Sequence, residues 1–274
     1  MLSKKLSIED VADKIAGQRV LMRVDFNVPI KNAVVKDTTK LTSTIPTINY
    51  ALAKGARSIV LMSHLGRPNG KPESKSTLKP VAEKLGELMG RQILFLNDCV
   101  GEETVKTCQN LQDGQVVLLE NLRFHLEEEV SVTEDSGEKV KASEENVNKF
   151  RADLTKLGDI YINDAFGTAH RAHSSMVGVN HSIRASGLLM KKEIDYFARA
   201  LETPQKPFLV IMGGAKVKDK IKLIMNMLEK VTDMIIGGGL SFTFLNYLKQ
   251  MKIGKSIFDK EGVKLVDDIM KKVK

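Results

Sequence analysis

Four short segments of this sequence combine arginine or histidine with small polar residues, a mixture suited to binding a small anion. The residues concerned are Asp25, Asn27, His64, Gly66, Arg67, Arg123, Asn163, Asp164, Gly167, His170, Arg171 and His173. An arginine guanidinium pairs through two hydrogen bonds with a phosphate or a carboxylate. Asp25 and Asn27 are suited to holding hydroxyl groups of the same molecule. The residue types therefore predict one basic cup that holds a small anionic substrate.

Each residue also has a simpler interpretation on its own. Arg23 and Arg67 would be surface residues, and Asp25 would be a turn former. His170 and His173, three residues apart, would suit a metal site, but no third histidine, cysteine or carboxylate completes a recognisable zinc spacing. An anion site accounts for all four segments together, and we favour it for that reason.

Two glycine-rich segments near the end of the chain predict a second anion site. Residues 213–220 read GGAKVKDK and residues 237–239 read GGG, each after a short apolar run. Glycines between a strand and a helix let backbone N–H groups approach a phosphate, which the helix dipole also favours. Lys216 and Lys220, four apart, would lie on one face of the helix start and point at that phosphate. Neither segment matches the P-loop or GxGxxG pattern, and solvated lysines with tightly packed glycines are the alternative.

Short apolar runs alternate with amphipathic stretches, which is typical of an α/β protein with a parallel sheet. The predicted strands are Arg19–Val24, Ser58–Met62, Gln92–Leu96, Val116–Glu120, Ile160–Ile162, Phe208–Met212 and Met234–Ile236. Helices are expected at Thr77–Met89 and Glu144–Leu157, and an exposed loop or hairpin at Glu134–Ala142. Ligands of open α/β sheets bind at the carboxyl ends of the strands, so these strands would position the residues named above.

The chain is predicted to form two domains. Five apolar residues between 190 and 201 recur at the spacing of one helix face, just before Pro204 and Pro207. We expect a first domain at residues 1–187, a hinge helix at 188–204 and a second domain at 205–274. The second domain offers two strands, too few for a stable sheet, so we expect it to be incomplete. The predicted fold is a Rossmann-like parallel sheet in three layers, α/β/α.

The charge of the chain is uneven, which bears on its partners. Residues 205–274 hold 14 lysines and arginines against 7 acidic residues, a net +7, whereas residues 1–204 carry +1 of the total +8. Basic domains often bind nucleic acid, but aromatic residues are only 5% here and do not interleave with the basic ones, so this interpretation is the weaker one. No apolar run approaches the roughly 18 residues of a membrane span. Cys99 and Cys108 fit neither a metal spacing nor a disulfide framework, so we expect a reducing cytoplasm.

Six segments together resemble the phosphoglycerate kinase family. They are RVDFNVPI (23–30), SHLGRP (63–68), LLENLRFHLEEE (118–129), YINDAFGTAHRAHSS (161–175), GGAKVKDKI (213–221) and IIGGG (235–239). They follow one another in the family's order and at its spacing. The resemblance implies two α/β domains joined by a hinge helix, one holding 3-phosphoglycerate and the other MgATP or MgADP. It also implies a cytoplasmic monomer that binds neither nucleic acid nor membrane.

Carried over position by position, the resemblance assigns residues to two sites. The phosphoglycerate site would comprise Asp25, Asn27, Ser63, His64, Gly66, Arg67, Leu122, Arg123, His170 and Arg171. The nucleotide site would comprise Gly214, Ala215, Lys216, Lys220 and Gly238. The implied reaction is the reversible phosphoryl transfer of glycolysis between 1,3-bisphosphoglycerate and ADP, giving 3-phosphoglycerate and ATP. Lys216 resembles the lysine that meets the transferred group, and Mg²⁺ would arrive with the nucleotide, with no metal ligand assigned in this chain.

Two departures from the family pattern bear on activity. Lys40 stands where the family has an arginine that acts on the transition state, so the planar guanidinium fork is lost. We expect slower transfer with binding largely kept. The family's second domain continues beyond residue 274, through further glycine-rich loops and an acidic Mg²⁺ ligand. We therefore expect a fragment with little or no kinase activity by itself. The alternative to the kinase function is a catalytically inactive fragment that binds 3-phosphoglycerate only.

Overall fold

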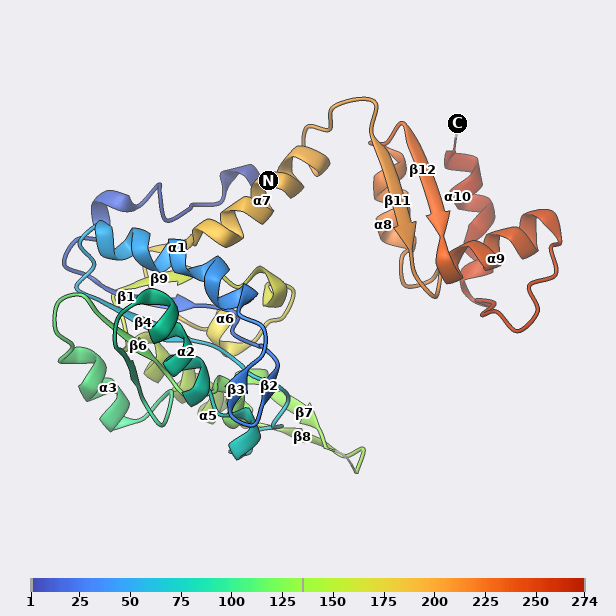
Figure 1. The fold of residues 1–274 in the computed structure, drawn as a ribbon. Coiled ribbons are helices and arrows are strands. Elements are labelled where there is room, and N and C mark those ends of the chain that lie inside the picture. The colour runs from blue at the N-terminus through green and yellow to red at the C-terminus, as the bar shows by residue number, and fades with distance from the viewer. Residues whose placement is uncertain (1, 135, 274) are drawn as a thin grey trace. The chain divides into compact units, whose positions relative to one another are not determined.

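The computed structural model describes residues 2–134 and 136–273, which form two compact units (Figure 1). Residues 3–195 make up the first unit, and residues 196–273 together with Leu2 make up the second. The division falls within one helix, α7, which spans Leu188–Leu201 and begins where the hinge helix was predicted to begin. No helix in the described part of the chain has both the length and the apolar character that crossing a membrane requires.

The first unit is built on a six-stranded parallel sheet in the order β10-β9-β1-β4-β6-β5. Its strands are β1 Arg19–Arg23, β4 Ser58–Met62, β5 Ile93–Phe95, β6 Gln115–Leu118, β9 Ile160–Asn163 and β10 Arg184–Ser186. The five strands predicted for this region are confirmed to within two residues at each end. The edge strand β10 was not predicted, because the sequence Arg-Ala-Ser contains no apolar run.

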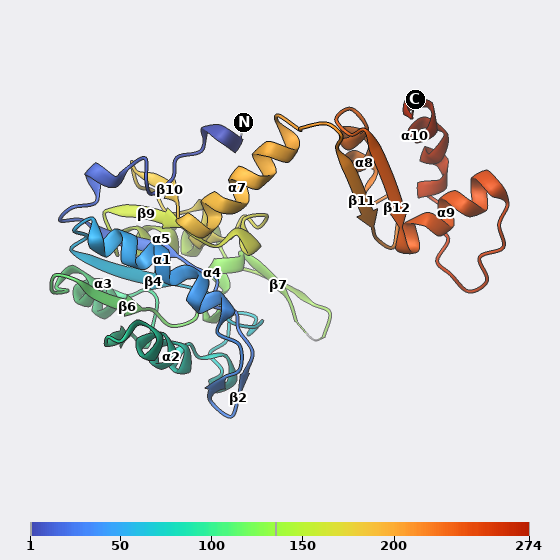
Figure 2. The same ribbon diagram turned by 45° about the horizontal axis from the view of Figure 1, so that its top comes forward.

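Helices cover both faces of this sheet and give the three α/β/α layers that were predicted (Figure 2). Helices α1 Thr39–Ala53 and α2 Lys79–Met89 pack on one face, and α3 Glu102–Gln109 and α5 Glu144–Thr155 on the other. Successive strand residues point to opposite faces, so each buried strand supplies both cores. Val20, Ile59 and Val116 join the core under α1 and α2, and Leu21, Val60 and Val117 join the core under α3 and α5.

Shorter elements complete the first unit at the surface. The pairs β2 Ile30–Lys31 with β3 Val34–Val35 and β7 Ser131–Thr133 with β8 Lys139–Lys141 are antiparallel. The one-turn helices are α4 Leu126–Glu129 and α6 Ser174–Val177. The polar segment predicted as a loop or hairpin at 134–142 follows β7 and includes β8, so it forms part of a hairpin. Its residue Asp135 lies outside the described residues.

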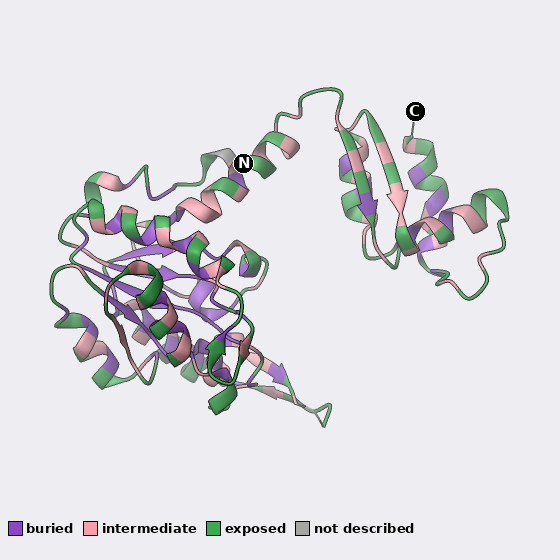
Figure 3. Cartoon of the chain, in the orientation of Figure 1, coloured by how far each residue is buried: buried purple, intermediate pink, exposed green. Residues whose placement is uncertain are grey.

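The second unit contains two parallel strands, as predicted, with helices packed on one face of the pair. The strands are β11 Leu209–Gly213 and β12 Asp233–Gly237, and the helices are α8 Ile221–Leu228, α9 Gly238–Lys249 and α10 Val266–Lys272. Alternate strand residues, among them Met212 and Ile236, join the core with these helices. Their neighbours point the other way, and Ile211 is 72% exposed. Figure 3 shows exposed and half-buried stretches along both strands of this unit. One face of this small sheet is therefore apolar and uncovered among the described residues.

Candidate functional site

The carboxyl ends of β1, β4, β6 and β9 meet at one edge of the sheet, because these four strands are parallel neighbours. The loops that follow them contact one another. Asn27 Oδ1 accepts a hydrogen bond from the backbone N–H of Gly66 at 3.0 Å, and Arg123 donates to the carbonyl of Gly66 at 2.7 Å. A Cβ at Gly167 would lie 3.0 Å from an oxygen of Asp25. The structure thus brings together the four segments that the sequence singled out.

Gly66 occupies a position that favours glycine. Its φ of +65° lies in the left-handed region, which a side chain with a Cβ rarely adopts. This conformation lets both backbone groups of Gly66 face neighbouring loops, the N–H toward Asn27 and the carbonyl toward Arg123. The glycine therefore ties three of the four loops together.

Asp25 and Lys40 form an ion pair at the rim of this edge. Lys40 lies in the first turn of α1, and its Nζ is 2.8 Å from Asp25 Oδ2. The Lys40 side chain is 43% exposed, so this cation is accessible from solvent although it is paired. Asp25 Oδ1 accepts the backbone N–H of Asn27 at 3.1 Å, which is a turn-forming contact. Asp25 is therefore both a turn former and the partner of Lys40.

Arg23 is fully buried, so its interpretation as a surface residue is wrong. Its Nε donates to Ser175 Oγ at 2.9 Å, and one terminal nitrogen lies 3.2 Å from His64 Nδ1. Ser175 in turn donates from its hydroxyl and its backbone N–H to the buried carboxylate of Glu128, at 2.6 and 2.9 Å. A buried guanidinium needs such partners, because an unpaired charge inside a protein is costly. An arginine within the apolar run VLMRV was the signal in the sequence for this network.

His64 lies beside Arg23 and is 4% exposed. Burial, together with the positive charge of Arg23, Arg123 and Lys40, lowers the pKa of His64 to about 2. The imidazole is therefore neutral at physiological pH. His173, from the same region, is 8% exposed, and burial with the neighbouring Arg123 and Arg171 lowers its pKa to about 4.

Several residues assigned to the phosphoglycerate site are part of the framework of the edge. Ser63 is fully buried, and its hydroxyl accepts the backbone N–H of Phe26 at 2.8 Å. The Leu122 side chain belongs to the core under α3 and α5, so only its backbone is available to a ligand. Arg123 is 4% exposed and pairs with Glu129 at 3.3 Å, while its Nε is buried without a hydrogen-bond partner.

The cations available to a ligand are those nearer the surface. Arg67 and His170 are exposed and Arg171 is half-buried. Among the described residues, none of these three side chains has a hydrogen-bond or ion-pair partner. Buried Arg23 and Arg123 thus supply positive potential and shape, whereas Arg67, His170 and Arg171 are free to bind an anion directly.

Asp164 does not face the cup, contrary to its inclusion among the strand-end candidates. Its carboxylate is fully buried and accepts hydrogen bonds from Thr47 Oγ1 at 2.6 Å and from the backbone N–H of Met190 at 3.0 Å. Met190 lies in the first turn of α7, where backbone N–H groups lack partners within the helix. A negative charge at that end of a helix is stabilising. Asp164 therefore anchors the start of α7 to α1 and β9.

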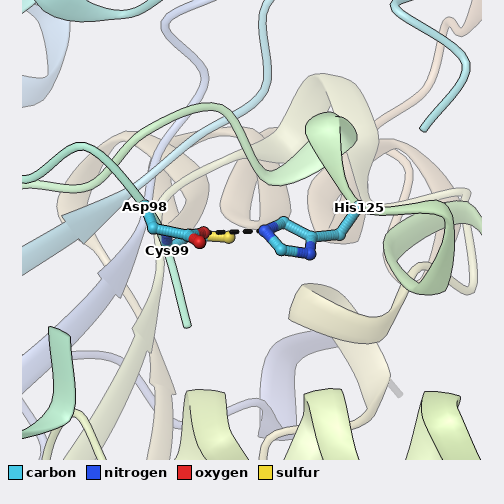
Figure 4. A group of neighbouring side chains, drawn as sticks. All are labelled: Asp98, Cys99 and His125. Atoms are coloured by element: carbon cyan, nitrogen blue, oxygen red, sulfur yellow. Dashed lines mark hydrogen bonds and ion pairs between the residues drawn. The ribbon is translucent and has the colours of Figure 1, made fainter. Parts of the chain in front are cut away.

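One group of potential metal ligands lies elsewhere in the first unit. Oxygen, sulfur and nitrogen atoms of Asp98, Cys99 and His125 are within 4.8 Å of one another (Figure 4). Asp98 Oδ1 already accepts the backbone N–H of Cys99 at 2.6 Å and His125 Nε2 at 2.7 Å. Burial raises the pKa of the Cys99 thiol well above its ordinary value, so the thiol stays protonated. These hydrogen bonds account for the group without an ion, and the pair His170 and His173 does not belong to it.

In the second unit the two glycine-rich loops pack against each other. The backbone N–H of Leu240 donates to the carbonyl of Gly214 at 2.7 Å, and Gly238, at the start of α9, has a left-handed φ of +60°. A Cβ at Gly239 would lie 3.0 Å from the carbonyl oxygen of Gly214 and 3.1 Å from Cα of Ala215. Glycine at 239 is thus required by the close approach of two backbones.

The prediction that Lys216 and Lys220 share a helix face is wrong. Helix α8 begins at Ile221, so Lys220 immediately precedes it and Lys216 lies in the loop after β11. The loop is held there because Lys218 donates its backbone N–H to Asp259 at 2.9 Å and Val217 is fully buried. Lys216 is exposed on this loop.

The fold and the two groups of loops define a class: a parallel α/β protein with basic side chains clustered at the carboxyl ends of one sheet's strands and glycine-rich loops at those of another. The family model for phosphoglycerate kinase matches residues 8–274. The chain therefore belongs to the phosphoglycerate kinase family, the glycolytic kinases that the sequence segments resemble.

Relatives and solved structures agree with this assignment. The chain is 58% identical over 274 residues to phosphoglycerate kinase of Plasmodium falciparum, covering 100% of this chain and 66% of that protein. It is 58% identical over 272 residues to phosphoglycerate kinase 2 of Homo sapiens, covering 99% and 65%. The structure of phosphoglycerate kinase from Coxiella burnetii matches with a TM-score of 0.80 at 34% identity, covering 98% of this chain and 63% of that one. The chain thus spans about two thirds of the length of its relatives.

Proposed function

We propose that this protein takes part in phosphoryl transfer between 1,3-bisphosphoglycerate and ADP, giving 3-phosphoglycerate and ATP. The main support is the meeting of four loops at one sheet edge, with free cations from two of them, in a chain of the phosphoglycerate kinase family. The cytoplasm is the compartment we propose, in keeping with two buried cysteines that are both free.

In this proposal the first unit binds the phosphoglycerate. Arg67, His170 and Arg171 pair with its phosphate and carboxylate, because their side chains are accessible and have no partner in the described chain. Asp25 and Asn27 hold its hydroxyl group. His64, Gly66 and Arg123 shape the cup, while Ser63 and Leu122 contribute through the backbone positions that they fix.

In the ATP-consuming direction the substrate carboxylate attacks phosphorus directly. A carboxylate with an ordinary pKa of about 3.5 is ionised at neutral pH, so no general base is needed. Catalysis then depends on positioning and on cations that match the charge on the transferring group. Lys40, at the start of α1, is the residue of the first unit that we assign to this role.

The second unit is proposed to hold the nucleotide. A Cβ at Gly213 or Gly237 would meet no atom within 4 Å, so the backbone at the ends of both strands is open to a phosphate. Lys216 and Lys220 supply cations beside these loops, with Gly214, Ala215 and Gly238 forming the surface that phosphates approach. In this proposal Mg²⁺ arrives with the nucleotide and is held by its phosphates. When bound, it neutralises phosphate charge.

Helix α7 is the proposed hinge that joins the phosphoglycerate-binding unit to the nucleotide-binding unit. Its first turn is anchored by Asp164 and Thr47, and the division between the two units falls further along the same helix. A hinge would let the two ligands bind separately and exclude water when they react. The domain limits 1–187, 188–204 and 205–274 are part of this proposal.

Separate titrations test the proposal. The purified chain is titrated by calorimetry with 3-phosphoglycerate and with MgATP, and a coupled kinase assay is run on the same sample. We expect 3-phosphoglycerate to bind, and turnover with both ligands would support the full reaction. Binding of the acid without nucleotide binding or turnover would support the alternative, a protein that binds 3-phosphoglycerate only. If neither 3-phosphoglycerate nor MgATP bound to the chain, the proposed function and its alternative would both be contradicted.

A further inference from the structure

The guanidinium of Arg23 contacts His64 in a way that determines which imidazole nitrogen carries the proton. Arg23 lies at the carboxyl end of β1 and is fully buried. Its terminal nitrogens donate to the backbone carbonyl of Val24 and toward His64 Nδ1, the latter at 3.2 Å. A guanidinium has five N–H donors and no acceptor. His64 Nδ1 must therefore be the acceptor and cannot carry a proton.

The orientation of Arg23 is itself held by a chain of buried hydrogen bonds. Arg23 Nε donates to Ser175 Oγ at 2.9 Å, and the Ser175 hydroxyl donates to Glu128 Oε1 at 2.6 Å. Glu128 is fully buried and lies in α4, whereas Ser175 lies in α6. Two separate elements thus fix the plane of the guanidinium and aim it at His64.

The second nitrogen of His64 remains available to a ligand. Among the described residues, Nε2 of His64 has no hydrogen-bond partner. The atom is not fully buried, so a ligand can reach it. The charged and titratable groups that face the ring are cationic or basic: Arg23 from β1, Lys40 from α1, Arg123 after β6 and His173 before α6. These neighbours and burial all oppose a second proton on the ring.

We propose that Arg23 is a positioning residue that holds His64 as its neutral Nε2–H tautomer, so that His64 meets an oxyanion of the ligand as a directional hydrogen-bond donor. The identity of that ligand as 3-phosphoglycerate rests on the proposed function. The tautomer itself does not. In this arrangement the positive charge comes from the arginines, and His64 supplies geometry. Its contribution to binding is constant across about pH 5 to 8, where an ordinary histidine would titrate.

The tautomer is measured directly by NMR on the chain labelled with ¹⁵N in its histidines. Long-range ¹H–¹⁵N spectra distinguish the two neutral tautomers and the imidazolium, and His64→Gln identifies the signals of His64. We expect one Nε2–H pattern that does not change between about pH 5 and 8. An Nδ1–H pattern, or titration to the imidazolium in this range, would overturn the proposal.

Arg23→Met removes the donor, and Arg19→Met at the other end of β1 is the matched control. Arg19 lies at the amino end of β1, a strand's length from Arg23, and forms an ion pair with Asp159 at 2.6 Å. In Arg23→Met we expect His64 to show mixed tautomers and a pKa nearer the ordinary value of about 6.5, with no change in Arg19→Met. A folded Arg23→Met with an unchanged His64 spectrum would contradict a positioning role. If Arg23→Met fails to fold, Ser175→Ala, which removes the acceptor of Arg23 Nε, is expected to give the same change to a smaller degree.

Adding 3-phosphoglycerate separates the two proposals. Binding should shift the Nε2 resonance of His64, and His64→Leu should bind the acid about tenfold more weakly, whereas His64→Gln keeps an N–H donor and most of the affinity. An Nε2–H tautomer with no response to the acid would contradict the proposed function and leave the tautomer standing. A titrating His64 in a chain that binds the acid would do the reverse.

Discussion

At the scale of single residues, the cations of the first unit have two different tasks. Arg23 and Arg123 are buried and hydrogen-bonded to protein groups, so they cannot easily leave their positions for a ligand. Arg67 and Arg171 have no such partners among the described residues. Pairing a ligand with the free cations breaks no existing contact, so their removal should affect binding more than stability.

Arg171→Ala should weaken binding of 3-phosphoglycerate by at least about tenfold, because a charge-assisted hydrogen bond to an oxyanion contributes about 1.5–3 kcal/mol. The free energy of unfolding should change by less than about 0.5 kcal/mol. The matched control is Arg57→Ala. Arg57 immediately precedes the amino end of β4, whereas the proposed site lies at the carboxyl ends of the strands. Calorimetry and denaturant unfolding measure the two quantities. Equal affinity of both variants for the acid would contradict the assignment of Arg171.

In an otherwise complete protein, Lys40→Arg should raise kcat by about tenfold or more with little change in KM. Arginine supplies two parallel donors to charge that spreads over the transferring phosphoryl oxygens, whereas lysine supplies one point charge. The control is Lys54→Arg, at the other end of α1 and away from the cup. Steady-state kinetics, or single-turnover measurement if turnover is slow, checks the result. No gain in Lys40→Arg would sink this explanation of the departure from the family pattern.

At the scale of elements, close packing of backbones organises the proposed nucleotide loops. The loop after β11 touches the start of α9 through the Leu240-to-Gly214 hydrogen bond, and the contact leaves no room for a side chain at Gly239. The geometry of these proposed phosphate-binding loops therefore depends on Gly239, a residue with no side chain that could bind a phosphate. Small changes at this contact should move both loops.

Gly239→Ala should destabilise the chain by about 1–3 kcal/mol and weaken nucleotide binding, because the new Cβ would press on two backbone groups. Gly213→Ala is the matched control for stability alone, since a Cβ there would meet nothing within 4 Å but would project into the proposed phosphate site. Denaturant unfolding and titration with MgATP measure the effects. If both variants lost the same stability, crowding at Gly239 would not be the reason.

At the scale of the whole molecule, buried histidines make stability depend on pH. Burial lowers the pKa of His173 to about 4 and that of His64 to about 2. Between these values and about 6.5 the unfolded chain binds a proton that the folded chain does not, so stability is present above about pH 6.5 and is lost as the pH falls. Burial raises the pKa of Asp164 and of Glu128, and these carboxyls act in the opposite direction at the acidic end.

His173→Gln should therefore flatten the pH dependence of unfolding between about pH 6.5 and 4, by up to about 1.4 kcal/mol per pH unit. The exposed His170, changed to Gln, is the matched control. Denaturant unfolding at a series of pH values gives the slope for each variant. A slope in His173→Gln that equals that of the parent chain would show that His173 takes up no proton on unfolding.

Much of the fold and of the candidate cup was predictable from local features of the sequence. Apolar runs with turn residues at their ends defined seven strands. In the first unit this works because helices cover both faces of the sheet, so its central strands must be apolar throughout. The same runs placed Asp25, His64, Arg123 and Arg171 at carboxyl ends of strands. The short strand β10 and the position of Lys216 in a loop were not predictable, because both depend on contacts with residues distant in the sequence.

The sequence by itself determined the α/β class and the family, and it predicted the chemistry of the anion site, since all three depend on residue type and order along the chain. Only the tertiary structure decided what each polar side chain faces. It placed Arg23 against Ser175, 152 positions away, and turned Asp164 from the cup to the start of α7. Burial and hydrogen bonds between distant loops determine whether a charged residue binds a ligand or supports the residue that does, and these are properties of the folded chain alone.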